Sequence, residues 1–162
     1  MEKSLVHGAD TPLHLAFSCY AFDPQGRLLL TRRALAKQTW PAVWTNTACG
    51  HPAPGEAPEA AVRRRLRTEL GLEVAPESVR LALPDFRYRA VDASGIVEHE
   101  ICPVYVVALR VDAHPEPDPA EVMEWRWVDP DALARTAEAA PYLLSPWSVL
   151  QLRELFPAPA VE

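Results

Sequence analysis

Short runs of hydrophobic residues recur along the chain, and most of them have the length and composition of β-strands. The residues from Leu13 to Phe22 are mainly apolar and aromatic, and they end at the turn-forming segment Asp23-Pro24-Gln25-Gly26. An apolar run resumes from Arg27 to Arg33, so this region predicts a β-hairpin. The same pattern predicts further strands over Val79–Val91, Ile96–Val111 and Met123–Val128.

Proline and glycine mark the ends of three predicted helices. The first runs from Pro58 to Leu70 and stops at Gly71. Asp129-Pro130 opens the second, with the aspartate as N-cap and the proline in the first helical position. Ser145-Pro146 opens the third by the same device, and it continues to about Phe156. Several strands and few helices predict an α+β sandwich.

Composition narrows the class of protein. Of the 162 residues, 49% are hydrophobic and 23% are charged, which predicts one globular domain over residues 1–162. No apolar run approaches the roughly 20 residues that cross a bilayer, and the net charge of −6 argues against nucleic-acid binding. We therefore expect a monomer with neither membrane nor nucleic-acid partners.

The cysteines and the N-terminus favour the cytoplasm. Cys19, Cys49 and Cys102 cannot all pair within one chain, and their spacing matches no Cys-x-x-Cys zinc site. Free thiols in a reducing compartment are the simplest interpretation. No basic and apolar secretory signal opens the chain.

Glu98 and Glu100 are candidates for a metal site. Alternation along a strand puts both carboxylates on one face and turns His99 away from them. Such a pair repels unless solvent or a cation relieves it, and the apolar flanks of this strand favour the cation. His7, His14 and His51 would complete a site for a divalent transition metal or Mg²⁺.

Two other groups carry candidate chemistry. Cys49, in Cys49-Gly50-His51, is either a reactive thiol or a buried structural one. Several arginines lie close together in the predicted helix over Pro58–Leu70. Arginines at this density would suit a diphosphate, although a helix with several arginines often only presents a solvated face. We expect Arg64 to face solvent. The cationic groups are Arg63, Arg64, Arg65 and Arg67; Arg32, Arg33 and Lys37; and Arg87 and Arg89.

The first predicted helix and the residues before it resemble the Nudix box, G-x5-E-x7-R-E-U-x-E-E-x-G-U with U apolar. The chain departs from the box at Arg65 and Thr68, where the pattern has glutamates. Those glutamates help to collect Mg²⁺ for pyrophosphate hydrolysis, so the resemblance implies a Nudix-type α/β/α sandwich that has given up this reaction. The matching positions are Gly50, Glu56, Arg64, Leu66, Glu69, Gly71 and Leu72.

Further motifs resemble type I isopentenyl diphosphate isomerases over nearly the whole chain. The resemblance implies the interconversion of isopentenyl and dimethylallyl diphosphates through a tertiary carbocation. The motifs are Thr31-Arg32-Arg33-Ala34, Trp40-Pro41-x-Val43-Trp44-Thr45-Asn46, Cys49-Gly50-His51-Pro52, Asp85-Phe86-Arg87-Tyr88-Arg89-Ala90, Ser94-Gly95-Ile96-Val97-Glu98-x-Glu100 and Ser145-Pro146-Trp147.

The resemblance also assigns roles to residues. It implies acid/base catalysis by Cys49 and Glu100 with help from Tyr88, and an aromatic face from Trp147 for the cation. It implies Mn²⁺, Zn²⁺ or Mg²⁺ at one site, and a second Mg²⁺ that binds with the substrate diphosphate at Glu69 and the Cys49 carbonyl. The first metal would bind to His7, His14, His51, Glu98 and Glu100, and the diphosphate to Lys3, Arg33, Lys37 and Arg65.

Two other functions stay open at this stage. A Nudix hydrolase of a small diphosphate is one, although Arg65 and Thr68 leave the box with few carboxylates. A non-catalytic or altered relative is the other, because family members usually carry a longer segment before the position of His7. Trp147 could also serve only as a core residue of its helix.

Overall fold

The larger of two sheets contains seven strands and mixes parallel with antiparallel pairs. The computed structural model describes Gly8 and residues 11–157. In this sheet the strand order is β10-β3-β2-β9-β6, with β4 paired to β3 and β5 to β2. β2 runs parallel to β9 and antiparallel to β3. The strands are β2 (Phe17–Phe22), β3 (Leu28–Arg33), β4 (Trp44–Thr45), β5 (Ala48–Gly50), β6 (Val79–Leu83), β9 (Val104–Ala108) and β10 (Val122–Val128).

A smaller sheet of three strands extends from the first and carries the two candidate carboxylates. Its order is β1 (His14–Leu15), β8 (Val97–Ile101) and β7 (Arg87–Val91). β8 therefore lies in the centre of this sheet. Glu98 and Glu100 are both buried, whereas His99 between them is not.

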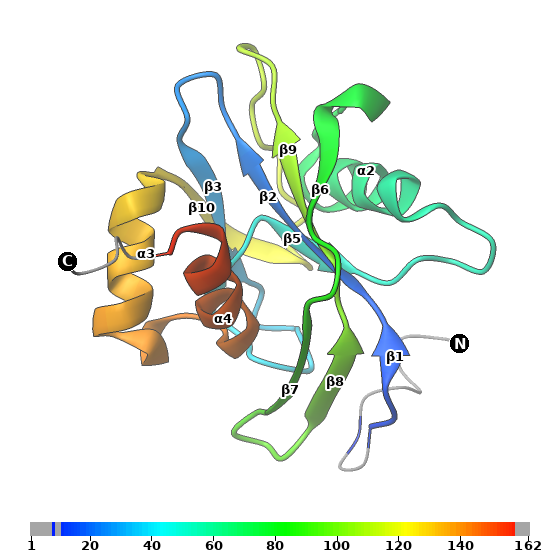
Figure 1. Cartoon of the computed structure of the whole chain (residues 1–162), viewed down its shortest axis with the longest axis vertical. Helices are drawn as coiled ribbons and strands as arrows, with labels where there is room; N and C mark the ends of the chain where they lie inside the picture. Colours follow the sequence, from blue (N-terminus) through cyan, green and yellow to red (C-terminus); the bar gives the residue numbers. More distant parts are fainter. Residues whose placement is uncertain (1–7, 9–10, 158–162) are drawn as a thin grey trace.

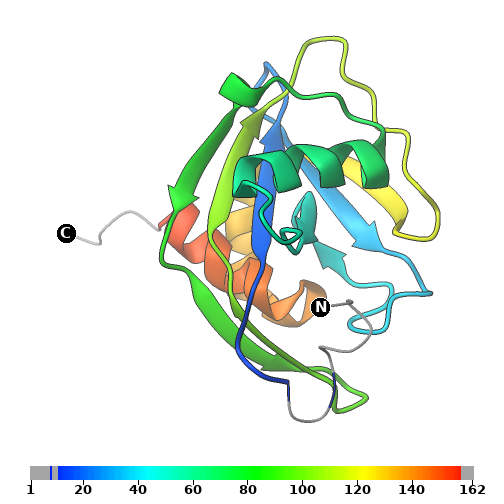
Figure 2. The same ribbon diagram turned by 90° about the vertical axis from the view of Figure 1, so that its right-hand side faces the viewer.

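Helices cover both faces of the larger sheet (Figures 1 and 2). α2 (Pro58–Leu70) packs on one face, and α3 (Pro130–Ala139) and α4 (Pro146–Leu155) pack on the other. Short 3₁₀ turns, Pro76–Ser78 and Pro141–Leu143, precede β6 and α4. The predicted α/β/α sandwich is confirmed. Within the described part of the chain, no helix combines the length and the hydrophobicity that crossing a membrane requires.

The core consists of two layers that β2 separates. Phe17 and Cys19 face α2 and pack with Leu66 of that helix. Tyr20 lies on the opposite face and packs in the layer that contains Trp147 of α4. Alternation along β2 thus supplies both layers, which explains why this strand is apolar at nearly every position.

Two predicted strands are shorter than the sequence suggested. The run from Val79 to Val91 is interrupted by the turn at Pro84-Asp85, and the run from Ile96 is interrupted at Cys102-Pro103. Proline cannot donate to a strand ladder, so each run divides and its second half pairs elsewhere. The short strands β4 and β5 were not predicted, because two or three residues carry no detectable period.

The predicted helix ends at Gly71, Asp129 and Ser145 are confirmed. Gly71 adopts a left-handed conformation with φ 65°, and its N–H donates to the carbonyl of Arg67. The Asp129 carboxylate accepts a hydrogen bond from the backbone N–H of Asp131. Ser145 is the N-cap of α4 with Pro146 in the first turn, as predicted, but its hydroxyl bonds Ser148 and Thr45 instead of a backbone N–H.

Replacing Leu66 with alanine should lower the free energy of unfolding by about 2–5 kcal/mol. Leu66 is fully buried between α2 and the sheet, so truncation leaves a cavity there. The neighbouring Arg67→Ala, at an exposed position of the same helix, should change that free energy by less than about 0.5 kcal/mol. Equilibrium urea unfolding measures both, and equal losses would contradict this packing.

Candidate active site and metal centre

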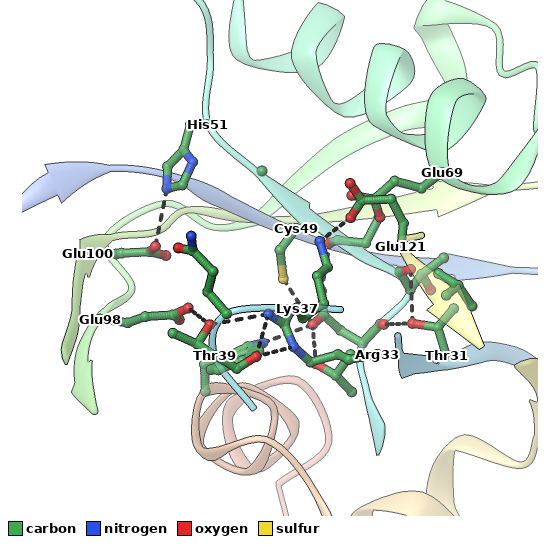
Figure 3. Close-up of a pocket in the computed structure, with 18 of the residues that line it drawn as sticks. Thr31, Arg33, Lys37, Thr39, Cys49, His51, Glu69, Glu98, Glu100 and Glu121 are labelled. Atoms are coloured by element: carbon green, nitrogen blue, oxygen red, sulfur yellow. Dashed lines mark hydrogen bonds and ion pairs between the residues drawn. The ribbon is translucent and has the colours of Figure 1, made fainter. Parts of the chain in front are cut away.

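A pocket opens where the smaller sheet meets β3, β5 and α4, and it gathers most of the candidate residues (Figure 3). Its lining is mostly polar and includes the aromatic side chains of Tyr88 and Trp147. Segments far apart in the sequence contribute to it, so the pocket depends on the complete fold. The candidate residues that line it are Arg33, Lys37, Cys49, His51, Glu69, Tyr88, Glu98, Glu100 and Trp147.

Strand register places Glu100 between His14 and Tyr88. His14 of β1 and Tyr88 of β7 each pair directly with Glu100 of β8. Directly opposed residues in a sheet project to the same face, so the three side chains meet. Nε2 of His14 lies 3.2 Å from Oε1 of Glu100, and the Tyr88 hydroxyl lies 2.9 Å from Oε2.

His14, His51 and Glu100 form a group that fits a metal ion. The two Nε2 atoms are 3.2 Å apart, and Nε2 of His51 is 3.3 Å from Oε1 of Glu100. Metal–ligand bonds of about 2.1 Å at tetrahedral or octahedral angles separate ligand atoms by about 3.0–3.4 Å. Nδ1 of His14 lies 2.9 Å from the Pro12 carbonyl; as its donor, it would leave the Nε2 lone pair of neutral His14 for a metal. The group therefore suits a divalent metal.

Glu100 and His14 change each other's protonation. Burial opposes ionisation of Glu100, but hydrogen bonds from His14 and His51 outweigh it and lower the pKa to about 2. Burial likewise opposes the charge on His14, but the contact with Glu100 raises its pKa above 6.5. Without a metal, the contact thus favours a charged imidazole beside a carboxylate.

Glu98, a predicted metal ligand, lies outside the group formed by His14, His51 and Glu100 and shares the Tyr88 hydroxyl with Glu100. Its Oε1 accepts a hydrogen bond of 2.6 Å from Thr39, and its Oε2 lies 2.7 Å from the Tyr88 hydroxyl. Tyr88 has one hydroxyl hydrogen, so it can donate to Glu98 or Glu100 but not to both. Burial raises the pKa of Tyr88 well above its usual value, which keeps that hydrogen in place.

Cys49 is held in the pocket wall by polar partners. Its Sγ lies 3.1 Å from Oδ1 of Asn46, which accepts, and 3.5 Å from the hydroxyl of Ser18. Burial raises the pKa of the Cys49 thiol. Cys19 and Cys102 are fully buried, as expected of core thiols.

Two of the predicted diphosphate contacts face the pocket. The guanidinium of Arg33 donates to the carbonyl of Thr39 and lies 5.4 Å from the centre of the Trp147 ring. Lys37 forms an ion pair with Glu121, which also lines the pocket. Glu121 was not a predicted site residue, because it lies outside every motif that carried the resemblance.

Arg65 is oriented differently from the other two cations. It forms an ion pair with Glu69, one turn further along α2, and lies 3.6 Å from Glu121. Its buried Nε has no hydrogen-bond partner among the described residues. Gly50 accommodates its side chain, because a Cβ on Gly50 would lie 2.9 Å from Cγ of Arg65. Arg65 thus occupies the space behind the pocket wall, beside Glu69.

The expectation that Arg64 merely faces solvent is wrong. Its guanidinium makes two hydrogen bonds to the Glu56 carboxylate, at 2.8 and 2.9 Å, and a third to the carbonyl of His51. The contact with Arg64 lowers the pKa of Glu56 to about 2. These Nudix-box residues therefore fasten the loop that presents His51.

Trp147 belongs to the core and also lines the pocket. It is 1% exposed and packs in the core, with Trp40 at 5.2 Å and Tyr88 at 5.7 Å between ring centres. It also lines the pocket. His7 and Lys3, two further predicted site residues, lie outside the described part of the chain.

Comparison with known sequences places this site in a family context. The NUDIX domain family matches residues 12–147. A protein of Leifsonia xyli subsp. xyli named isopentenyl-diphosphate Delta-isomerase is 56% identical over 157 residues, which cover 97% of this chain and 84% of that protein. One of the same name from Agromyces mediolanus is 61% identical over 153 residues, 94% of this chain and 72% of its own length.

Solved structures support the fold. A MutT protein from Methanosarcina mazei Go1 has a TM-score of 0.67 at 17% identity, over 88% of this chain and 91% of that one. A MutT NUDIX hydrolase from Burkholderia pseudomallei has a TM-score of 0.62 at 22% identity, over 89% of this chain and 98% of that one. At these identities the similarity concerns the architecture alone.

The contact between His14 and Glu100 should make the stability of the metal-free protein depend on pH. Its contribution is complete above the ordinary carboxyl pKa of 4.5 and lost as the pH falls towards 2, the folded-state pKa of Glu100. On the alkaline side the contribution of this contact is complete below pH 6.5, the ordinary pKa of histidine, and it is lost as the pH rises through the raised pKa of His14. It is therefore largest between these two ordinary values.

Urea unfolding of the parent protein and of His14→Gln tests this in chelating buffer. The parent's advantage in unfolding free energy should shrink between about pH 6 and pH 8. With a divalent metal, the same advantage should grow with pH, because imidazole must be neutral to bind metal. An advantage that responds to neither pH nor metal would contradict the assignment.

Proposed function

Since the chain belongs to the NUDIX domain family and, within it, to the isopentenyl-diphosphate Delta-isomerases, we propose that it interconverts isopentenyl and dimethylallyl diphosphates. The observation that carries the proposal is a pocket that contains both a thiol and a carboxylate, together with aromatic side chains and cations. Cys49, Glu100 and Trp147 all line it, with Arg33 and Lys37.

The reaction moves a carbon–carbon double bond and needs both an acid and a base. A proton is added to the terminal methylene carbon, which leaves a tertiary carbocation at the branched carbon. A second proton then leaves the neighbouring carbon on the diphosphate side, and the new double bond forms there. No carbonyl group shares the charge, so the protein must stabilise the cation and exclude water.

Cys49 and Glu100 are our proposed proton-transfer groups. They reach the pocket from different sheets, Cys49 from β5 and Glu100 from β8, so a flat substrate between them would present a different face to each. Burial keeps the thiol of Cys49 protonated. Tyr88 would assist, since its hydroxyl lies 2.9 Å from Glu100 and can pass a proton to it or hold it in place.

Trp147 and Tyr88 would receive the hydrocarbon part of the substrate. Their rings lie 5.7 Å apart. The π face of an indole attracts a cation, an interaction that is worth about 2 kcal/mol or more when desolvated. Burial of both rings supports the exclusion of water, which would otherwise trap the cation as an alcohol.

Metal ions and cations would anchor the diphosphate and the base. We propose that His14, His51 and Glu100, with Glu98 and His7, hold Mn²⁺, Zn²⁺ or Mg²⁺, which when bound fixes the Glu100 carboxylate and lowers its basicity. We further propose that Glu69 and the Cys49 carbonyl hold a Mg²⁺ that binds with the substrate. The proposed diphosphate contacts are Lys3, Arg33, Lys37 and Arg65.

Domain organisation, oligomeric state, location and partners complete the proposal. We propose that residues 1–162 act as one domain and as a monomer. We also propose that the protein works in the cytoplasm on a small-molecule diphosphate, without a nucleic-acid or membrane partner. The three free thiols support a reducing compartment.

With Mg²⁺, the purified protein should convert isopentenyl diphosphate to dimethylallyl diphosphate. In D₂O the product should gain deuterium, because the acid that protonates the alkene exchanges its proton with solvent. NMR of the product measures both the isomerisation and the label. Release of inorganic phosphate without isomerisation would instead indicate a Nudix hydrolase, and product free of deuterium would exclude the acid/base mechanism.

Cys49→Ala and Glu100→Gln should each lower kcat by at least about 10²–10⁴-fold, because each removes a proton-transfer group. Cys102→Ala is the matched control, since that thiol is buried in the core and does not line the pocket. It should lose stability but keep a kcat close to that of the parent. Steady-state kinetics and thermal unfolding separate these effects, and a Cys49→Ala variant with nearly normal kcat would refute the role of Cys49.

A further inference from the structure

The side-chain amide of Asn46 is fully buried beside Cys49, and its orientation is fixed by its surroundings. Nδ2 donates to the carbonyl of Ala48 at 2.7 Å and to the carbonyl of Cys19 at 3.2 Å. Carbonyl oxygens only accept hydrogen bonds, so the amide nitrogen must face them. The amide oxygen must therefore point the other way.

Three donors converge on that oxygen. Oδ1 of Asn46 accepts from the indole N–H of Trp147 at 3.0 Å, the thiol of Cys49 at 3.1 Å and the hydroxyl of Thr45 at 2.8 Å. An indole N–H can only donate, which independently identifies the accepting atom as the oxygen. One atom thus contacts the side chains of Cys49 and Trp147, which come from β5 and α4.

We propose that Asn46 is a positioning residue that holds the Cys49 thiol and the Trp147 ring in a fixed relation to each other. The inference rests on the proposed function, which requires the proton to be transferred to a carbon whose neighbour becomes the cation facing the ring. An error of about 1 Å in such an arrangement can cost on the order of 100-fold in rate. A hydrogen bond to a common oxygen limits the movement of both groups at once.

A purely structural role for Asn46 makes a different prediction. The donors on Nδ2 satisfy two backbone carbonyls, and losing them would destabilise the loop between β4 and β5 without a selective effect on turnover. Ser148 provides a matched control for that role. Its hydroxyl accepts from the backbone N–H of Asn46 at 3.0 Å, and it is as buried as Asn46, but no described hydrogen bond joins it to Cys49 or to the Trp147 indole.

The experiment compares Asn46→Ala with Ser148→Ala in steady-state kinetics and thermal unfolding. Asn46→Ala should lower kcat by about 10–100-fold and leave KM for isopentenyl diphosphate within about twofold, because the diphosphate contacts are elsewhere. Ser148→Ala should lower the melting temperature and leave kcat nearly unchanged. Should Asn46→Ala fail to fold, Asn46→Ser retains a polar atom but is one bond too short to replace the amide oxygen.

Two further measurements distinguish positioning from a general loss of structure. Among the five tryptophan indole N–H resonances, the one that Trp147→Phe removes should shift in the Asn46 variants and stay in place in Ser148→Ala. The losses in kcat from Asn46→Ala and Trp147→Phe should also be less than multiplicative in the double variant, because both break the same hydrogen bond.

The outcomes separate this inference from the function on which it rests. A parent protein without isomerase activity would overturn the proposed function. An active parent whose Asn46 variants keep its kcat, or whose Trp147 indole resonance does not move, would overturn the positioning role alone. Fully multiplicative losses in the double variant would also overturn it, since Asn46 and Trp147 would then act independently.

Discussion

The pairing of β8 with β1 on one side and β7 on the other is the constraint on which the site depends. Register alone sets His14 and Tyr88 opposite Glu100, so this carboxylate meets an imidazole and a phenol without any help from loops. A shift of one residue would turn Glu98 and Glu100 to the other face and expose His99 to the pocket. The backbone hydrogen bonds of this sheet therefore determine which side chains meet at the centre.

The larger sheet and its helices supply what the smaller sheet cannot. β5 brings Cys49, and the loop after it brings His51, which Arg64 and Glu56 of the Nudix box hold through the backbone. In this chain the box therefore contributes to the position of His51 in the group that could hold a metal ion, in addition to presenting Glu69 to the pocket. The cationic side of the site is partly neutralised by Glu69 and Glu121, so a diphosphate would enter a region in which opposite charges are already paired.

Local rules in the sequence predicted the sandwich, the helix that ends at Gly71, and the common face of Glu98 and Glu100. These depend on period, on glycine conformation and on strand parity, all of which act over a few residues. The sequence could not predict Asn46 or Glu121, because their importance arises from partners about 100 and 84 residues away. The contacts of Arg64 could not be predicted for the same reason, because the helix sequence does not show that the loop containing His51 packs against it.

The pairing of Arg65 with Glu69 also bears on how such a protein can change its activity over evolution. Restoring the glutamate of the Nudix pattern at position 65 would place a third carboxylate beside Glu69 and Glu121. It would also empty the space against which Gly50 packs. The exchange would also remove the cation that pairs with Glu69 and lies 3.6 Å from Glu121. Because the chain departs from the Nudix pattern at Thr68 as well as at Arg65, an exchange at position 65 alone would not restore the pattern, and the contacts of Arg65 indicate that it would not be a neutral step.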